Sequence, residues 1–310
     1  MTISVVPEGA LAYGMQLPVQ SLSTRVSMPW EQTGTVADMN RVAQACDAAG
    51  FLYVAVCHHV AIPREPAEAM STQWFDPIAT LGYLAGQTHR TRLMTNVYVA
   101  PYRHPLDSAK AFATLDALSE GRLIIGIGAG HVEGEFDALG VPFAERGART
   151  DAALSVLDQA LRTEWTNDVG QRPRPVQHPR PPLWIGGSGK PALRRVAHIG
   201  DGWIPQATSL EQLPADIDWI RREVERVRPG ASPEIGYHLL AHVGEPTWEL
   251  PKGVLKGSAD RIAGFANDRL GVLGVAHLQV RLLARDVEEL CDQVTAFGAE
   301  VGPLLRRKPL

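Results

Sequence analysis

The sequence predicts an α/β protein whose eight parallel strands close a TIM (β/α)8 barrel, with inserted loops at the C-terminal face. Two observations carry this prediction. Eight short apolar runs alternate with eight segments of helical spacing, and such an alternation gives a parallel sheet joined by crossovers. The 310 residues show no composition break, repeat or long linker, so we expect one domain over residues 1–310.

The elements can be placed from hydrophobic spacing and from helix start and stop signals. Gly50 follows the first helix as a stop, Pro105 opens the third, and Ser258 caps the seventh. Asp286 with Glu289 resembles a capping box for the last helix. We expect strands over residues 13–18, 51–56, 92–99, 123–127, 182–185, 201–204, 235–243 and 276–282. We expect helices over residues 36–49, 75–85, 105–118, 150–163, 191–199, 210–227, 259–270 and 287–297.

Net charge, cysteine spacing and the length of apolar runs indicate which partners the protein is not expected to have. The formal net charge is -4 and no basic stripe is present, so no nucleic-acid partner is expected. Three widely spaced cysteines suit a reducing, cytoplasmic setting without a disulfide framework. No apolar run reaches transmembrane length and the N-terminus does not read as a signal peptide, so no membrane partner is expected.

The stretch over residues 122–134 is where the expected site begins. Its apolar run suits a strand buried on both faces, and Gly126, Gly128 and Gly130 follow at every second position. Small residues at a strand end let a flat or charged ligand approach the backbone closely. A dinucleotide fingerprint would need a third glycine where His131 stands, and a helix directly after it. We therefore do not expect a nucleotide-binding fold.

Other candidate residues follow the second and third strands, at the face where barrel enzymes carry their active sites. His59 is a candidate acid or base, because histidine titrates near neutral pH. Asn96 is placed to reach a ligand carbonyl or amide, although an inward-pointing amide held by water would explain it equally. Cys57, His58 and His59 do not suggest a metal site, because adjacent side chains on a strand point to opposite faces.

Two further patterns leave alternatives open. Gly186, Gly187 and Ser188 come between the fifth strand and a helix, where glycine and free N–H groups favour a phosphate over a plain turn, and Lys190 would add positive charge. His277, Gln279 and Arg281 alternate along the eighth strand. They share one face, which is either the barrel lumen or the side that packs against helices.

Five segments, taken in order, resemble the bacterial luciferase-like monooxygenase family. They lie at residues 96–105, 115–123, 126–130, 135–140 and 183–188, and include the runs DALSEGRL, GIGAG and LWIGGS. The resemblance extends from the first strand to the last helix. It is strongest with the actinobacterial branch of deazaflavin (coenzyme F-420)-dependent oxidoreductases.

The resemblance implies site residues as well as a fold. A non-prolyl cis peptide behind the cofactor ring would fall at Asn96–Val97, and the histidine that follows strand two in relatives matches His59. The cofactor would also contact Gly128, Ala129 and Gly130, and its phosphate would lie at Gly186, Gly187 and Ser188. An acidic residue of some relatives is replaced by His131, which we take as a second catalytic candidate. The connector before strand five lacks the hairpin-like segment common in relatives.

The function implied is hydride transfer between a deazaflavin and a small organic substrate. The first alternative is an FMN-dependent monooxygenase supplied with reduced flavin by a partner reductase, and the second is a non-catalytic flavin-binding protein. A cofactor-free hydrolase is disfavoured, since no paired carboxylates or metal ligands stand at the strand ends.

The resemblance also implies a homodimer through helices two and three. Ala79, Leu84, Ala109 and Ala113 suit such an interface, but suit packing on the barrel equally well. The substrate-binding loops carry Trp30, Trp74, Phe136 and Trp248, which favour an apolar or aromatic-lined pocket.

Overall fold

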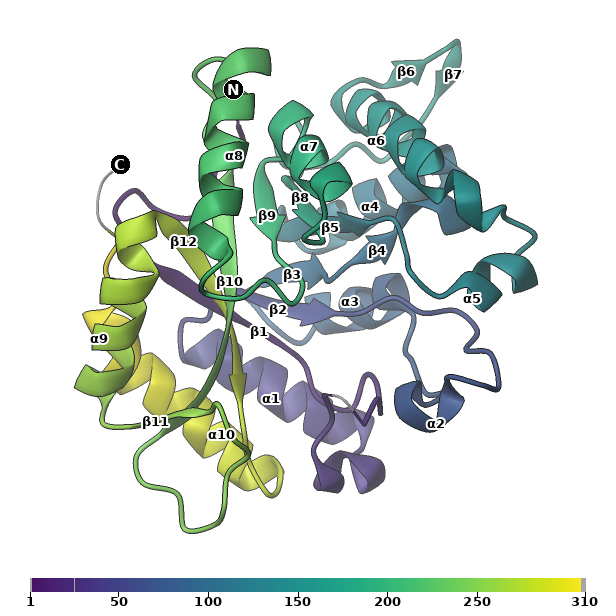
Figure 1. Cartoon of the computed structure of the whole chain (residues 1–310). Helices are drawn as coiled ribbons and strands as arrows, with labels where there is room; N and C mark the ends of the chain where they lie inside the picture. The colour runs from purple at the N-terminus through teal and green to yellow at the C-terminus, as the bar shows by residue number, and fades with distance from the viewer. Residues whose placement is uncertain (1, 25, 308–310) are drawn as a thin grey trace.

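The computed structural model describes residues 2–24 and 26–307 and confirms the predicted barrel (Figure 1). Each barrel strand pairs in parallel with the next, and the last strand pairs back to the first, which closes the ring. The ring contains β1 (Ala12–Gln16), β2 (Tyr53–Val56), β3 (Arg92–Thr95), β5 (Leu123–Gly128), β8 (Leu183–Gly186), β9 (Gly202–Ile204), β10 (Glu234–Val243) and β12 (Val275–Leu282).

Eight helices cover the outside of the barrel, as expected from the alternating pattern. Their first turns show why they begin where they do. The Ser258 side chain accepts from the Arg261 amide, and Asp76 accepts from the amides of Ile78 and Ala79. The helices are α1 (Val36–Ala48), α3 (Pro77–Ala85), α4 (Pro105–Leu118), α6 (Arg146–Arg162), α7 (Lys190–His198), α8 (Leu213–Val227), α9 (Ala259–Arg269) and α10 (Val287–Ala296).

Several expectations need correction. The third strand is broken by a bulge at Asn96–Val97 and resumes as β4 (Tyr98–Val99). The connector before β8 does contain a hairpin, formed by β6 (Trp165–Thr166) and β7 (Val169–Gly170), because Asn167 and Asp168 both take the left-handed conformation that a tight turn needs. Glu289 accepts from the Arg285 amide instead of closing a box on Asp286, although Asp286 does cap α10.

Three short elements lie in the loops, outside the expected pattern. They are α2 (Ala67–Met70), α5 (Glu133–Ala138) and β11 (Leu255–Gly257). The helix α5 follows the glycines of the fourth strand, where Glu133 and Glu135 in its first turn suit the positive end of the helix dipole.

The barrel interior at the amino ends of the strands is filled by large side chains. Tyr53, Trp184 and His277 are fully buried there, and the Trp184 and His277 rings stack with centroids 4.1 Å apart. A Cβ on Gly202 would lie 2.5 Å from the Trp184 ring, and one on Gly14 would lie 2.5 Å from Tyr53. Glycines on neighbouring strands therefore make room for the aromatic rings of this layer, which we call the barrel base.

The N-terminal segment lies against the barrel base. Val5 packs on the cluster that contains Tyr53 and Trp184. One carboxylate oxygen of Glu234 accepts from the Ser4 hydroxyl and from the amides of Val5 and Val6, at 2.7, 2.9 and 2.6 Å. This segment therefore closes the barrel at the end opposite the loops.

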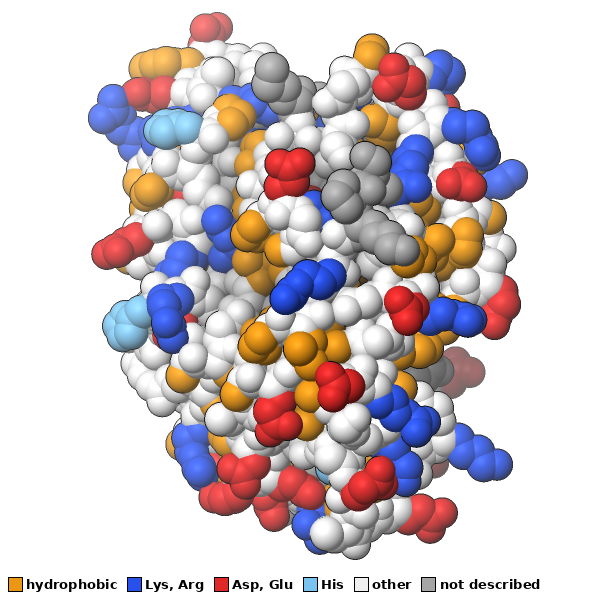
Figure 2. All heavy atoms as spheres, turned by 90° about the vertical axis from the view of Figure 1, so that its left-hand side faces the viewer, with side chains coloured by type: hydrophobic (Ala, Val, Ile, Leu, Met, Phe, Trp, Pro, Cys, Tyr) orange, Lys and Arg blue, Asp and Glu red, His pale blue; other side chains and the backbone are white. Residues whose placement is uncertain are grey.

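Two surface properties can be stated for the described residues. On the face that carries α9 and α10, acidic and basic side chains are interspersed without a continuous basic stripe (Figure 2). Within residues 2–24 and 26–307, no helix combines the length and the apolar character needed to cross a bilayer.

Candidate active site

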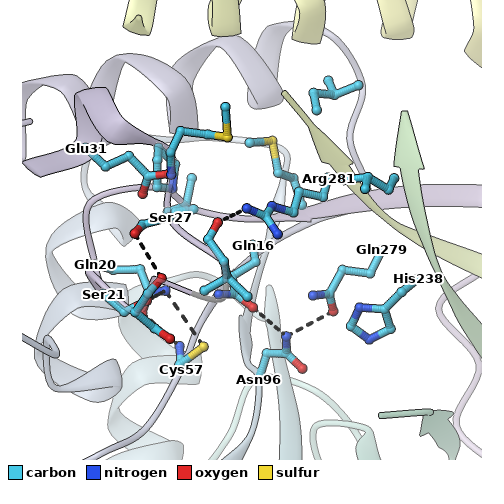
Figure 3. A pocket seen from close by; sticks show the side chains of 18 of the residues that line it. Gln16, Gln20, Ser21, Ser27, Glu31, Cys57, Asn96, His238, Gln279 and Arg281 are labelled. Carbon is cyan, nitrogen blue, oxygen red and sulfur yellow. Dashed lines mark hydrogen bonds between the residues drawn. The ribbon is translucent and has the colours of Figure 1, made fainter. Parts of the chain in front are cut away.

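A cavity of about 570 Å³ opens at the carboxyl ends of the barrel strands. Its size falls in the range of small-molecule and cofactor sites. Much of its wall is apolar, and a limited set of polar groups lines it (Figure 3). The polar and aromatic lining residues are Gln16, Gln20, Ser21, Ser23, Ser27, Trp30, Glu31, Cys57, His59, Trp74, Asn96, His131, Gln206, His238, Gln279 and Arg281.

On the cavity wall, His59 forms a pair with a buried carboxylate. His59 Nδ1 lies 2.6 Å from Glu135 Oε2, although the two residues are 76 positions apart in the sequence. The other Glu135 oxygen accepts from the amides of Val60 and Ala61 at 2.7 and 3.2 Å. The Tyr102 hydroxyl donates to Glu135 Oε2 at 3.2 Å. The Glu135 side chain has no solvent exposure, so this network fixes the His59 ring.

The network keeps Glu135 ionised. Burial by itself would raise the pKa of Glu135, but the hydrogen bonds from His59 and the two amides outweigh burial and lower it. An ionised Glu135 accepts the Nδ1 hydrogen of His59 and leaves Nε2 as the ring nitrogen that can take up or release a proton. The pair therefore has the arrangement of a general acid or base with an orienting carboxylate.

Aromatic rings surround this pair. The rings of His59 and Trp74 have centroids 4.2 Å apart, and His59 and His131 meet edge to face at 5.7 Å. Both predicted catalytic residues, His59 and His131, thus lie together on the cavity wall, and His131 is the more exposed of the two.

His58, next to His59 in sequence, has a different environment. Its ring stacks on Tyr98 with centroids 4.7 Å apart, and its Nδ1 accepts from the Val99 amide at 3.0 Å. Burial, with a smaller contribution from the nearby Arg103 cation, lowers the pKa of His58 to about 4. His58 is therefore a neutral residue that holds β4 in place, and the two adjacent histidines point to opposite sides as expected.

The bulge after β3 shapes the cavity floor. The Asn96–Val97 peptide bond is cis, as the resemblance implied. The Val97 side chain packs where Cβ atoms on Gly128 or Gly186 would each lie 2.5 Å from it, so these two glycines accommodate the bulge. Asn96 Nδ2 donates to Gln16 and Gln279, whereas its buried Oδ1 has no partner among the described residues.

The predicted phosphate turn lies beside a second cavity of about 420 Å³. Gly187 has φ 112°, which favours glycine, and Lys190 lines the cavity at the start of α7. The Ser188 hydroxyl is engaged within the protein: it donates to the Gln206 carbonyl and accepts from the Gln206 amide and the Thr208 hydroxyl. In this arrangement a phosphate would meet the backbone and Lys190 rather than the Ser188 hydroxyl.

The other residues that were predicted to contact the cofactor, Gly128, Ala129 and Gly130, contribute to packing. Gly128 is fully buried, and Gly128, Ala129 and Gly130 are absent from the cavity wall. A Cβ on Gly130 would lie 2.8 Å from both Phe136 and Val99. These residues position the loop that carries His131 and Glu135.

The eighth strand presents its alternating residues to the lumen, which decides between the two alternatives. Gln279 and Arg281 line the cavity, and His277 lies deeper, in the barrel base. His238 on β10 also lines the cavity, and sequence reasoning did not single it out (Figure 3). Desolvation by the surrounding protein lowers the pKa of His238 to about 4.

The loop aromatic residues and the residues considered for a dimer interface differ in their environments. Trp30 and Trp74 line the cavity, but Phe136 is buried against Val99 and Tyr102, and Trp248 donates to Glu289 outside the cavity. Of the four residues considered for a dimer interface, Leu84, Ala109 and Ala113 are buried within the monomer and Ala79 is exposed. Within the described part of the chain, no group of three or more His, Cys, Asp or Glu side chains is placed to hold a metal ion.

A parallel (β/α)8 barrel with a largely apolar cavity at its carboxyl face, a histidine paired with a buried carboxylate and a glycine-rich turn at a helix start is typical of cofactor-binding enzymes. Comparison with known proteins makes the assignment specific. The chain matches the luciferase-like monooxygenase family over residues 17–260 and belongs to that family.

One sequence relative and two solved structures of the same fold are similar to this chain. The FMNH2-dependent dimethylsulfone monooxygenase of Pseudomonas putida is 25% identical over 262 residues, which cover 78% of this chain and 69% of the relative. The monooxygenase RslO1 of Streptomyces bottropensis superposes with a TM-score of 0.78 at 20% identity, over 94% of this chain and 99% of that one. The coenzyme F420-dependent tetrahydromethanopterin reductase of Methanopyrus kandleri superposes with a TM-score of 0.71 at 17% identity, over 95% of this chain and 99% of that one.

Proposed function

We propose that the protein is a deazaflavin-dependent oxidoreductase that transfers a hydride to or from a small organic substrate in the barrel cavity. The observation that carries this proposal is the His59–Glu135 pair on the cavity wall. Reduction of a carbonyl or similar group by hydride also consumes a proton, and the reverse reaction releases one. A histidine oriented by a buried carboxylate is suited to supply or accept that proton.

The residues present fit a flavin-type cofactor. The unpartnered Oδ1 of Asn96 is a buried acceptor that a ring N–H would satisfy, and Val97 would support the ring from behind. Gly187 and Lys190 would hold the phosphate beside α7. When bound, the deazaflavin supplies or accepts the hydride.

Protein groups would perform the remaining tasks. Glu135 holds the His59 ring through Nδ1, so that the proton exchanged with the substrate is at Nε2. The Tyr102 hydroxyl and the amides of Val60 and Ala61 keep the carboxylate in place. The apolar wall excludes bulk water from the reacting atoms.

A second candidate function is an FMN-dependent monooxygenase. It is favoured by the Pseudomonas putida relative, whose name states FMNH2 dependence and which is 25% identical to this chain. In that case a flavin reductase would be the partner that supplies reduced FMN. For either function we propose a cytoplasmic homodimer, in which the exposed Ala79 and Tyr83 of α3 contact the second copy.

A side-by-side titration of cofactor-free protein with the deazaflavin and with FMN tests the proposal, with cofactor fluorescence as the readout. We expect the deazaflavin to bind at least ten times more tightly than FMN in either redox state. A preference for reduced FMN would replace hydride transfer with the monooxygenase function. Binding of neither cofactor by the folded protein would contradict both.

A further inference from the structure

Three hydrogen-bond donor side chains share one wall of the cavity. Gln16 ends β1, and Gln279 and Arg281 lie on the adjacent strand β12. The register pairs Met15 with Val280, so Gln16 and Arg281 are neighbours across the two strands. Gln279 and Arg281 are two residues apart and therefore share one face. We call Gln16, Gln279 and Arg281 the donor wall (Figure 3).

Asn96 sets the orientation of the two glutamines. Its Nδ2 donates to Gln16 Oε1 at 3.2 Å and to Gln279 Oε1 at 3.0 Å. Both glutamine carbonyls are therefore engaged within the protein. The two glutamine NH2 groups have no partner among the described residues, and both residues line the cavity. The network thus presents N–H donors to a ligand.

Arg281 adds a cation with unused donors. Its guanidinium donates to the Val26 carbonyl, and guanidinium has five N–H donors in all. The nearest carboxylate described, Glu31, uses one oxygen for the Met28 amide at 2.7 Å and the other for the Val19 amide at 2.8 Å. Glu31 therefore moderates the charge of Arg281 from a distance and does not occupy its donors. A guanidinium at a protein wall is costly unless an acceptor pairs with it.

Apolar side chains surround the donor wall. Met28 and Trp30 come from the loop that follows β1, and Leu240 comes from β10. The cavity thus combines clustered donors with a wide apolar surface. A ligand that matches both has oxygen acceptors at one end and a hydrocarbon or aromatic body.

We propose that the donor wall binds the carboxylate of an organic-acid substrate, with Arg281 as the ionic partner and Gln16 and Gln279 as additional donors. The binding site stands on the contacts above, and its assignment to the substrate rests on the proposed function. The reacting carbon would then lie between the donor wall and His59, since both line the same cavity.

Calorimetric titration with benzoate and with benzamide, its neutral isostere, tests this inference on both cofactor-free and cofactor-loaded protein. We expect benzoate to bind at least tenfold more tightly than benzamide. Arg281→Met and Gln279→Leu should each remove this preference. Gln206→Ala should preserve it, because Gln206 lies on the same cavity but outside the donor wall.

Two variants are needed because Arg281 also anchors the loop at Val26, so its loss could disturb that loop. Gln279→Leu leaves the anchor intact, and thermal unfolding of each variant verifies the fold. Equal binding of benzoate and benzamide, no saturable benzoate binding, or equal loss in Gln206→Ala would overturn the inference. Displacement of benzoate by the cofactor would assign the donor wall to the cofactor and overturn the inference while the proposed function stands. If the protein preferred benzoate to benzamide but bound neither cofactor, the carboxylate site would stand and the proposed function would fail.

Discussion

The barrel base and the cavity are two layers of the same lumen, built from the same eight strands in different ways. At the base, Tyr53, Trp184 and His277 fill the lumen, and the glycines that face them pack closely against their rings. At the cavity, Gln16 and Asn96 leave hydrogen-bonding atoms without partners among the described residues. Dense packing of the rings stabilises the base, although Trp184 Nε1 and His277 Nε2 also lack partners among the described residues, whereas donors and acceptors that face the open cavity can bind a ligand. The two roles are therefore separated along the barrel axis.

Replacing His59 at the cavity should have the largest effect and should leave the base untouched. We expect His59→Gln to reduce turnover by roughly 10²- to 10⁴-fold, the usual contribution of a general acid or base. The Tm should change little, because His59 contributes one ring at a cavity wall. Steady-state kinetics with a reducible carbonyl compound and a thermal melt measure the two effects.

Glu135→Gln is the matched variant for this measurement. It keeps the shape of the side chain but removes the carboxylate that orients His59 through Nδ1, so turnover should fall while the fold is kept. Full activity of His59→Gln at every pH would remove the pair from the mechanism.

Replacing a residue of the barrel base should lower the stability of the protein and leave its cofactor affinity nearly unchanged. Trp184→Ala deletes a fully buried indole stacked on His277, and such truncations cost about 3–5 kcal/mol of unfolding free energy. Chemical denaturation measures this loss. Cofactor affinity per folded molecule should stay within about twofold at a temperature where the variant is folded. A large affinity loss with unchanged stability would break the separation between the two layers.

The smallest predicted effect is a pH dependence that originates at the base and at His58. Burial lowers the pKa of His277 to about 3 and that of His58 to about 4, so both are neutral in the folded protein. Below pH 6.5 the unfolded chain binds protons that the folded protein does not, so stability falls as the pH drops from 6.5 toward 4. At pH 5 each histidine should reduce the unfolding free energy by on the order of 2 kcal/mol relative to neutral pH.

His277→Phe isolates one of these contributions, since phenylalanine keeps a ring against Trp184 but does not titrate. Urea unfolding of both proteins between pH 4 and 7 should give a slope that is smaller by about one proton in the variant. Parallel curves would mean that His277 does not couple folding to protonation.

Regular periodicity allowed the fold to be predicted from the sequence. Apolar spacing located the eight strands and eight helices, with strand and helix ends shifted by a few residues, because each such element buries one continuous face. The hairpin of β6 and β7 was missed because each strand has two residues and both β7 residues are exposed. A pattern of burial cannot reveal elements that bury almost nothing.

The sequence allowed single residues at strand ends to be predicted, but not the contacts that these residues make with one another. His59 and Asn96 were identified by their positions after strands, and His131 by the family resemblance; all three line the cavity. Glu135 was not assigned a role, because its partner lies 76 residues away and the buried α5 carboxylate looks like any helix-start acid in the sequence. His238 was missed because it lies inside a long strand whose lumen-facing side the sequence does not mark.

The N-terminal segment at the barrel base has a consequence for how the chain is made. The carboxylate that holds residues 4–6 belongs to Glu234, on the seventh strand of the ring, more than two hundred positions later in the chain. The segment must wait, unpaired, while more than two hundred residues are synthesised, and it docks only when the ring is nearly complete. The segment is therefore synthesised long before its partner but docks only late in folding. Its docking would report the closure of the barrel.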